Sequence, residues 1–147
     1  TNTRLVLAED PDKFGILPLG DVDGSDSLLF ARSDFLSDRA ADMQILLEEL
    51  MRSARQINAD PTLPARLREE MGLLPDLPQE LVDEITPYYE TAVKQGMFVE
   101  DGGGLPAALG DFEFLIASGG LKGPASSLNP ENFWSFGLLD KAKAALN

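Results

Sequence analysis

A helical pattern interrupted by a proline, from Pro78 to Gly96, most constrains how this chain can fold. Proline at a first helical position loses only an N–H group that would be unpaired, so Pro78 is a suitable helix start. Apolar residues then recur at spacings of three and four, which places them on one face. Pro87 clashes with the carbonyl four residues back, so we expect the helix to kink there or to restart with Thr86 as its cap. Gly96 can take positive φ and end the helix.

Similar spacing predicts further helices, each with a start or stop signal. The expected helices run from a cap at Ser37 or Asp38 to Asp60-Pro61, from Thr62 to Gly72, from Pro106 to Gly119-Gly120, and from Leu138 to the C-terminus. The sequence Asn129-Pro130-Glu131 adds a cap, a first-position proline and a first-turn acid. Together these signals predict five or six helices.

Two short apolar runs have the character of strands. The run from Arg4 to Ala8 ends at a turn cluster, and the run from Ser27 to Arg32 is apolar on both faces, which is typical of a central strand. The expected fold class is therefore α/β and helix-rich, with two to three short strands. Because two strands make a poor sheet alone, we expect the chain to be a piece of a larger protein or to pair with another copy.

The composition argues against several classes of function. There are 25 acidic and 12 basic residues, and the net charge of −13 disfavours nucleic acid and anionic membranes, which are bound through clustered lysine and arginine. Histidine, the usual general base and the commonest metal ligand, does not occur, and neither does cysteine. We therefore expect no enzymatic activity and no cofactor.

Short motifs occur in an order that is similar to a known family. They are residues 28–36 (Leu-Leu-Phe-Ala-Arg-Ser-Asp-Phe-Leu), 54–61 (Ala-Arg-Gln-Ile-Asn-Ala-Asp-Pro), 88–96 (Tyr-Tyr-Glu-Thr-Ala-Val-Lys-Gln-Gly), 111–114 (Asp-Phe-Glu-Phe), 132–134 (Asn-Phe-Trp) and 138–142 (Leu-Leu-Asp-Lys-Ala). Their order resembles the C-terminal half of an ABC-transporter substrate-binding protein of the nitrate, sulfonate and taurine type, a branch that includes binders of thiamine-pyrimidine precursors. The resemblance covers most of the chain from Leu28 to Ala145.

The resemblance implies a partial lobe of the type II periplasmic-binding-protein fold, in a periplasmic or lipid-anchored extracytoplasmic receptor. Such a receptor closes on a small solute and passes it to an ABC permease in the membrane. The solute would be a small anionic or sulfur- or nitrogen-containing nutrient, such as a sulfonate, taurine, nitrate or a pyrimidine precursor. Residues 1–26 would belong to the second lobe and its crossover, and residues 27–147 would form the helix-rich C-terminal part of the first lobe.

The acidic loop at residues 20–26 is the main candidate site. Three carboxylates and a serine within six residues could bind Ca²⁺, because hard cations prefer several oxygen ligands on a tight turn. The glycine stands at the fourth place rather than the sixth, and no bidentate glutamate follows at the right distance, so a solvated turn is the better interpretation. The resemblance implies a third possibility, in which Asp23, Ser25 and Asp26 line the solute cleft.

Three further features have both a functional and a structural interpretation. The glycines at 102–104 precede a helix and could present N–H groups to an anion, although such a run is more often a flexible connection. Tyr88-Tyr89 and Phe133-Trp134 could stack on a planar ligand, but aromatic residues at helical spacing usually pack in a core. Three pairs of acids are expected to be solvated on outer helix faces: Glu48-Glu49, Glu69-Glu70 and Asp83-Glu84.

The alternative function belongs to a different class, a free-standing helical domain that works by self-association or partner docking. The strand expected from Ser27 to Arg32 motivates it, because an open strand edge invites pairing with another chain. A homodimer through that strand is therefore a prediction to be weighed against solute binding.

Overall fold

The computed structural model describes residues 10, 12–15 and 28–146. This part of the chain contains six α-helices, two 3₁₀ turns and no strand. The helices are α2 (Ser33–Asp38), α3 (Ala40–Ala59), α4 (Leu63–Met71), α5 (Gln79–Lys94), α6 (Leu105–Ala117) and α7 (Gly137–Leu146), and the turns are η1 (Ala125–Ser127) and η2 (Pro130–Asn132). The number of helices agrees with the prediction of five or six. The predicted α/β fold class is wrong for the described residues, which contain no strand.

The segment expected to be a central strand is not one in its described part, residues 28–32. Leu28, Leu29 and Phe30 are 57%, 69% and 96% exposed, and α2 begins directly afterwards at Ser33. A central strand needs neighbours that pair with its backbone N–H and C=O groups, and the described chain supplies no such strand. The other expected strand, from Arg4 to Ala8, and the domain boundary expected at residue 26 lie outside the described residues.

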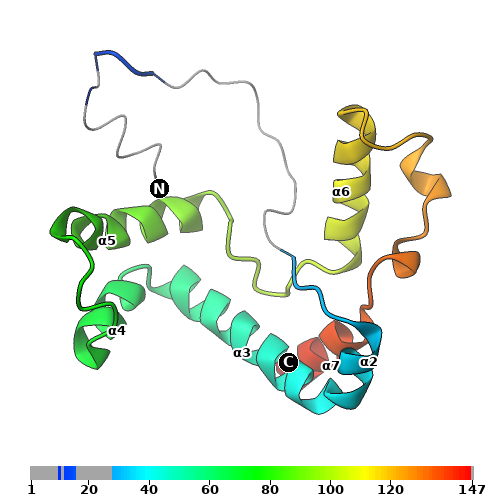
Figure 1. The fold of residues 1–147 in the computed structure, drawn as a ribbon, viewed down its shortest axis with the longest axis horizontal. Coiled ribbons are helices and arrows are strands. Elements are labelled where there is room, and N and C mark those ends of the chain that lie inside the picture. The colour runs from blue at the N-terminus through cyan, green and yellow to red at the C-terminus, as the bar shows by residue number, and fades with distance from the viewer. Residues whose placement is uncertain (1–9, 11, 16–27, 147) are drawn as a thin grey trace.

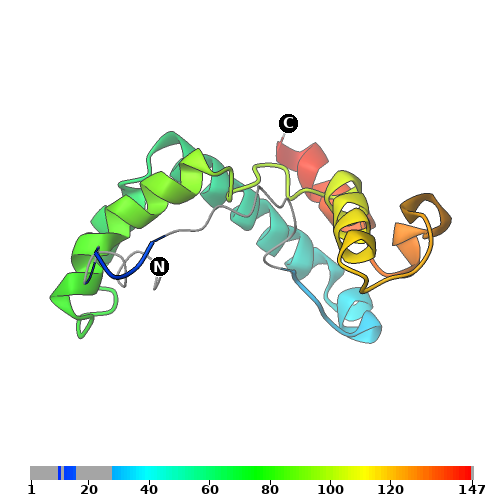
Figure 2. The ribbon, with the colours of Figure 1, turned by 90° about the horizontal axis from the view of Figure 1, so that it is seen from above.

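Four of the other helices, α2, α4, α5 and α7, pack against α3 (Figure 1). Helix α7 packs along it most extensively, α2 packs near its beginning, and α4 and α5 pack against it on the other side of the molecule. The Arg55 guanidinium donates to the Leu146 carbonyl at 3.4 Å, so the end of α7 lies beside the second half of α3. Viewed from above, the described chain forms an open arch rather than a closed globule (Figure 2).

The end of α5 shows how local sequence fixes a helix boundary. Gly96 has a φ of +68°, its N–H bonds the Val93 carbonyl at 3.0 Å, and the N–H of Met97 bonds the Ala92 carbonyl at 3.0 Å. This pair of bonds is a Schellman motif, which satisfies carbonyls that the helix leaves unpaired. The predicted stop at Gly96 is confirmed, and Gly72 and Gly119 end α4 and α6 in the same way.

Of the two outcomes expected at Pro87, a kink or a restart capped by Thr86, the restart does not occur. Helix α5 continues through Pro87, so no restart occurs at Thr86, and Pro78 takes the N-cap position rather than the first helical one. The side chain of Thr91 donates to the Pro87 carbonyl at 2.8 Å. A proline inside a helix loses one backbone bond, and the apolar face that α5 packs against its neighbours compensates for that loss.

The predicted cap of α3 is also wrong, because Ser37 and Asp38 lie inside α2. Arg39 occupies the N-cap position instead and forms an ion pair with Asp42 at 3.3 Å. The predicted end of α3 at Asp60 is confirmed. Ser37 and Asp38 could not serve as the cap of α3 because the short helix α2, which precedes α3, already includes them.

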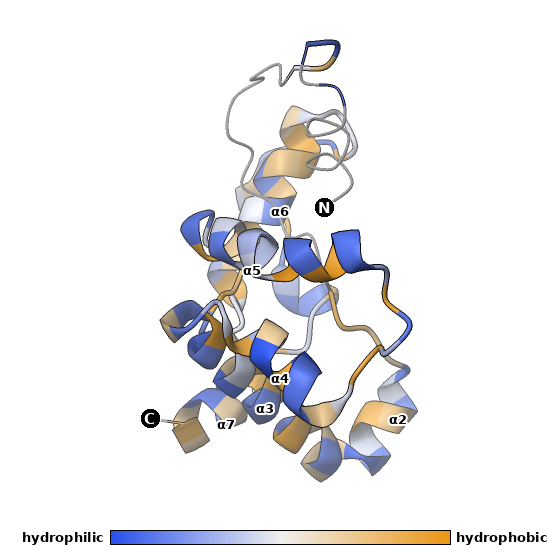
Figure 3. Cartoon of the chain, turned by 90° about the vertical axis from the view of Figure 1, so that its left-hand side faces the viewer, coloured by the Kyte–Doolittle hydropathy of each residue, from blue (hydrophilic) through white to orange (hydrophobic). Residues whose placement is uncertain are grey.

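Few side chains of the described residues are buried. The buried residues are Met51, Ala92, Ala108, Phe112, Pro130 and Ala142. Three of the six are alanines, which bury little apolar area each. Helix α6 is hydrophobic over most of its length (Figure 3), and such a helix is normally covered on all sides. Large parts of the apolar helix faces therefore remain accessible.

Candidate functional site

An apolar groove of about 510 Å³ lies between α6 and the group formed by α2, α3 and α7. Among the described elements, α6 packs closely only against η1 and η2, so it does not cover the face that α3 and α7 present to it. Residues 28–31 and the glycine turn before α6 complete the walls. The groove thus exists because α6 is held at a distance from α3.

The α3 wall of the groove comes from a regular helical pattern. Met43, Leu46, Leu47, Leu50 and Met51 line it and recur at spacings of three and one, which places them on one face. Met51 is only 3% exposed, whereas Leu46 and Leu50 are 42% and 46% exposed. From first to last these residues cover roughly 12 Å of helix, about two turns. The apolar face of α3 is therefore wider than the area that its packing partners in the described chain cover.

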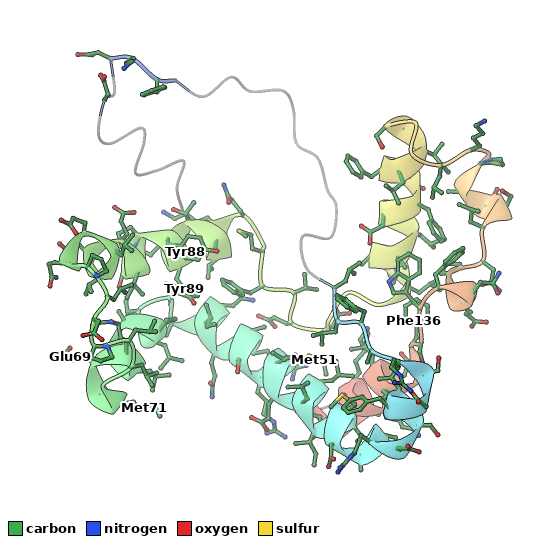
Figure 4. The ribbon with its side chains drawn as sticks, in the orientation of Figure 1. Met51, Glu69, Met71, Tyr88, Tyr89 and Phe136 are labelled. Carbon is green, nitrogen blue, oxygen red and sulfur yellow. The ribbon has the colours of Figure 1, made fainter. Side chains whose placement is uncertain are left out.

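The remaining walls are also apolar and accessible. Leu28, Leu29 and Phe30 form one rim together with Phe35 of α2, and all four are large, exposed side chains. Figure 4 shows Met51 on α3 and Phe136 just before α7, both of which line the groove. Sequence reasoning assigned residues 28–30 to a strand, so it missed their role as a groove wall.

Asp111 of α6 is the one charged residue in the lining that the structure describes, and it is half-buried. Two basic residues that lie within a few positions of lining residues form ion pairs with acids of the chain itself. Arg32 pairs with Asp34, and Lys143 pairs with Asp101 at 3.2 Å. Asp111 shares the apolar run from Leu105 to Ala117 with Glu113, so the sequence shows acids in this helix but not which of them lines the groove.

The glycine turn before α6, residues 102–104, is connected to α7 through Asp101. Asp101 accepts the N–H of Gly103 at 2.9 Å through one carboxylate oxygen and the Lys143 ammonium through the other. The Gly103 N–H, followed by Lys143, lowers the pKa of Asp101 below its ordinary value. Because Asp101 itself accepts the Gly103 N–H, the turn uses that donor internally and does not present it to an anion. Gly102, Gly103 and Gly104 all take positive φ, and the Gly104 N–H donates to the Gly102 carbonyl at 2.9 Å.

The predicted aromatic pairs contact other rings of the chain. Trp134 lies 5.2 Å from Phe112, centroid to centroid, and Phe133 lies 5.8 Å from Phe112. Trp134 also lines the groove and is the only tryptophan of the chain, so its fluorescence reports on that site. The rings of Tyr89 and Phe98 stack at 5.6 Å, and neither residue lines the groove.

The end of α4 and the loop after it present a second exposed apolar surface. Met71, Leu73 and Leu74 are exposed there, and Leu74 has a φ of +50°, which is unusual for a branched side chain. The Arg68 guanidinium donates to the Leu74 carbonyl at 3.1 Å and holds this conformation. Figure 4 shows Met71 at the tip of α4, away from Met51, so this surface is separate from the groove.

The other predicted site residues are not brought to the groove. Asp23, Ser25 and Asp26 lie outside the described residues, as does the rest of the acidic loop. Solvation of the paired acids is confirmed for Glu49, Glu69, Glu70 and Asp83, which are exposed, but not for Glu48 and Glu84, which are half-buried. Glu48 accepts a hydrogen bond from the Gln44 side chain at 2.9 Å.

Comparison with family models, with curated proteins and with solved structures finds no match. The resemblance to a substrate-binding protein therefore stays a prediction. In the part of the chain that the structure describes, no group of three or more acidic side chains could hold a metal ion. None of the described helices is both long and apolar enough to cross a bilayer.

Proposed function

We propose that this chain is a helical docking module, which binds a helical segment of another protein in the groove between α3, α6 and α7. The observation that carries the proposal is the exposure of large apolar side chains along the groove, such as Leu46, Leu50 and Phe35. Contiguous exposed apolar surface of this kind marks interaction sites in proteins. Its burial by a partner is favourable by roughly 25 cal/mol for each Å² of apolar area.

The groove suits a macromolecule better than a small ligand. Its volume of about 510 Å³ is compatible with either. Small-molecule sites, however, enclose most of the ligand surface, whereas Leu29 and Phe30 on the rim remain largely exposed. An open apolar groove leaves a small ligand in contact with water but matches one face of a longer segment.

The α3 wall favours a helix as the occupant. Amphipathic helices bind in apolar grooves through side chains at positions i, i+3 or i+4, and i+7. Those positions cover roughly 12 Å of helix, the length over which α3 presents its apolar side chains. An occupant helix of about two turns would therefore contact the whole wall.

A designed peptide tests the docking function. The peptide carries leucine at helical spacing on one face and neutral glutamine and alanine elsewhere, and its binding is followed by Trp134 fluorescence. We expect the double variant Leu46→Asp, Leu50→Asp to bind it at least about tenfold more weakly, because two charges enter the apolar contact. Ile45→Asp is the matched control, since Ile45 lies on α3 with 59% exposure and does not line the groove.

Equal binding by the double variant and the wild type would refute the proposal. So would equal binding of a scrambled peptide of the same composition, because scrambling removes the apolar face. Circular dichroism of each variant shows whether its helices are retained.

A second candidate is the solute-binding component of an ABC importer, and the order of the motifs between residues 28 and 142 supports it. Titration calorimetry with sulfonates, taurine, nitrate and pyrimidine precursors tests this candidate. Binding of one solute that the double variant retains would favour it over docking. The permease partner and the extracytoplasmic location depend on that outcome.

The homodimer stays a prediction as well, although residues 28–32 form no strand through which two copies could pair. Exposed Leu29 and Phe30 could contact a second copy in another way. Native mass spectrometry of the wild type and of Phe30→Ser decides the matter. A dimer that the substitution dissociates would support self-association, and a monomer at all concentrations would contradict it.

A further inference from the structure

Building on the proposed docking function, we infer that α6 is a lid of the groove, which swings onto α3 and occupies the site until a partner helix displaces it. Two apolar surfaces face each other across the groove without close contact. Both helices line the groove, yet no Cα atom of α6 lies within 8 Å of one of α3. Apolar surfaces of one chain favour mutual burial, because burial removes both from water.

The face that α6 presents to the groove has the pattern of a docking helix. Its lining residues are Gly104, Ala107, Ala108 and Asp111, at the spacing i, i+3, i+4 and i+7 that amphipathic helices use in apolar grooves. The two alanines are small, so α6 can approach α3 to roughly the 8–10 Å between the axes of packed helices. Leu115 continues this face beyond the groove and is 38% exposed. The chain thus carries a helix that fits its own site.

Closure also has costs, and these keep the open form populated. Asp111 is half-buried on the closing face, and the approach of α3 removes more of this carboxylate from water. The start of α6 is held in its open position by the ion pair of Asp101 with Lys143. Because these effects oppose the burial of apolar surface, a partner can shift the balance between the closed and open forms.

The moving part is residues 105–134, which we call the lid. Within it, α6 packs on η1 and η2. The ring of Phe112 contacts those of Phe133 and Trp134, at centroid distances of 5.8 and 5.2 Å. Phe112 and Pro130 are buried. These internal contacts allow the lid to move as one body.

Two short connections join the lid to its neighbours, and both suit a hinge. The glycines at 102–104 precede it, and their backbones can change φ and ψ at low steric cost because they lack a Cβ atom. Ser135 and Phe136 follow the lid, belong to no regular element and lead into α7 at Gly137. Hinges consist of a few residues of this kind, in loops or at the ends of elements.

Closure within one chain is favoured over insertion of α6 into a second copy. A tether of a few residues keeps α6 beside its own groove at a roughly millimolar effective concentration. A second copy would bring another net charge of −13 toward this one, which repels it. The lid of the same chain is therefore the better internal occupant.

A pair of cysteines tests closure, because the chain has none of its own. Leu50→Cys on α3 and Ala107→Cys on α6 place two thiols in the groove lining. A disulfide needs Cα atoms within about 7 Å, so this one forms only when the lid closes. We expect mild oxidation to cross-link the monomer, and an excess of the designed leucine peptide to slow cross-linking at least about fivefold.

The matched control replaces the α3 position only. Ile45→Cys combined with Ala107→Cys has its first thiol on α3 but outside the groove lining. This pair should cross-link at least about fivefold more slowly than the pair in the groove.

The locked lid should block docking. We expect the oxidised variant to bind the designed peptide at least about tenfold more weakly than the same variant after reduction, as followed by Trp134 fluorescence. The reduced form is the control for the two substitutions themselves. Circular dichroism shows whether the helices are retained.

Spin labels give a second measurement that leaves the groove lining intact. Ile45→Cys and Glu113→Cys place the labels at exposed positions of α3 and α6, neither of which lines the groove. We expect a shorter and a longer distance between the labels, and the peptide should enrich the longer one. A single distance that the peptide leaves unchanged would overturn the lid.

The outcomes separate the lid from the docking function. If the reduced variant binds the peptide but no cross-link forms, docking stands and the lid is overturned. Equal cross-linking of the control pair, or equal peptide binding before and after reduction, overturns the lid as well. Cross-links between two chains would make a second copy the occupant. If neither the wild type nor the reduced variant binds the peptide, docking fails, and cross-linking alone still decides for or against closure.

Discussion

Lys143 Nζ lies 3.2 Å from a carboxylate oxygen of Asp101, and this ion pair connects α7 to the turn that begins α6. The other oxygen of Asp101 accepts the N–H of Gly103 at 2.9 Å. Since α6 packs closely only on the two 3₁₀ turns among the described elements, this connection helps to fix its distance from α3 and α7. The width of the groove depends on that distance.

Two substitutions of Asp101 should separate the turn from the ion pair. Asp101→Ala removes both interactions and should lower the free energy of unfolding by about 1–2 kcal/mol. Asp101→Asn keeps an acceptor for Gly103 but loses the charge, and should cost only about 0.5 kcal/mol, the typical value of an exposed pair. Urea unfolding measures both values. Equal losses would mean that the charge, and not the turn, carries the effect.

Gly104 should tolerate alanine poorly, in contrast to Gly110 in the same region. Gly104 has φ +69° and ψ −143°, a conformation essentially restricted to glycine, so Gly104→Ala should destabilise the protein by about 1–3 kcal/mol. Gly110 lies inside α6, and a Cβ atom there would meet nothing within 4 Å. Gly110→Ala should therefore stabilise the protein by about 0.5–1 kcal/mol. Thermal unfolding of both variants tests the contrast. A change of stability in the same direction in both variants would contradict the prediction.

Asp60 should make stability depend on pH in acid. The Thr62 hydroxyl, followed by the Arg66 guanidinium, lowers the pKa of Asp60 from 3.8 to about 2. Because the folded pKa is the lower one, the contribution of Asp60 is present above the unfolded pKa and is lost as the pH falls through about 4 to about 2. Unfolding experiments across this range should show a flatter pH profile for Asp60→Asn than for the wild type.

The matched control for that experiment is Asp76→Asn, which removes the same charge from an exposed loop position. It should keep the wild-type slope between about pH 4 and about pH 2. A carboxyl titration of Asp60 by NMR provides an independent check. An ordinary pKa for Asp60 in the folded chain would refute the prediction.

Pro87 should be replaceable with a gain in stability. Proline inside a helix costs about 3 kcal/mol relative to alanine, while its stiffening of the unfolded chain returns at most about 1 kcal/mol. Pro87→Ala should therefore raise the free energy of unfolding by about 2 kcal/mol. Pro78→Ala, at the N-cap, should change it far less. A loss of stability in Pro87→Ala would show that the packing of α5 requires the proline.

Several elements could be predicted from the sequence because their causes are local. Gly96 ends α5 through bonds to carbonyls three and five residues earlier, all within one turn and a half of helix. Asn129 accepts the N–H of Glu131 at 3.1 Å, as its cap pattern predicted, although only a 3₁₀ turn follows. The continuation of α5 through Pro87 could not be predicted from the local sequence, because it depends on packing between helices.

The groove and its acid could not be predicted for the same reason. The motif Asp111-Phe-Glu-Phe114 was noticed only as part of a family pattern. Nothing in the spacing of Leu28, Leu29 and Phe30 tells whether an apolar run pairs as a strand, packs inside or stays exposed. That outcome depends on partners that are distant in sequence.

The sequence by itself determined where most helices end and which of their faces are apolar, because capping, glycine conformation and helical period act over a few residues. The tertiary structure alone decided that α6 stands apart from α3 and that Asp111 lies in the wall between them. It also decided that residues 28–32 form no strand. These features depend on contacts across the chain, which the local pattern of residues does not encode.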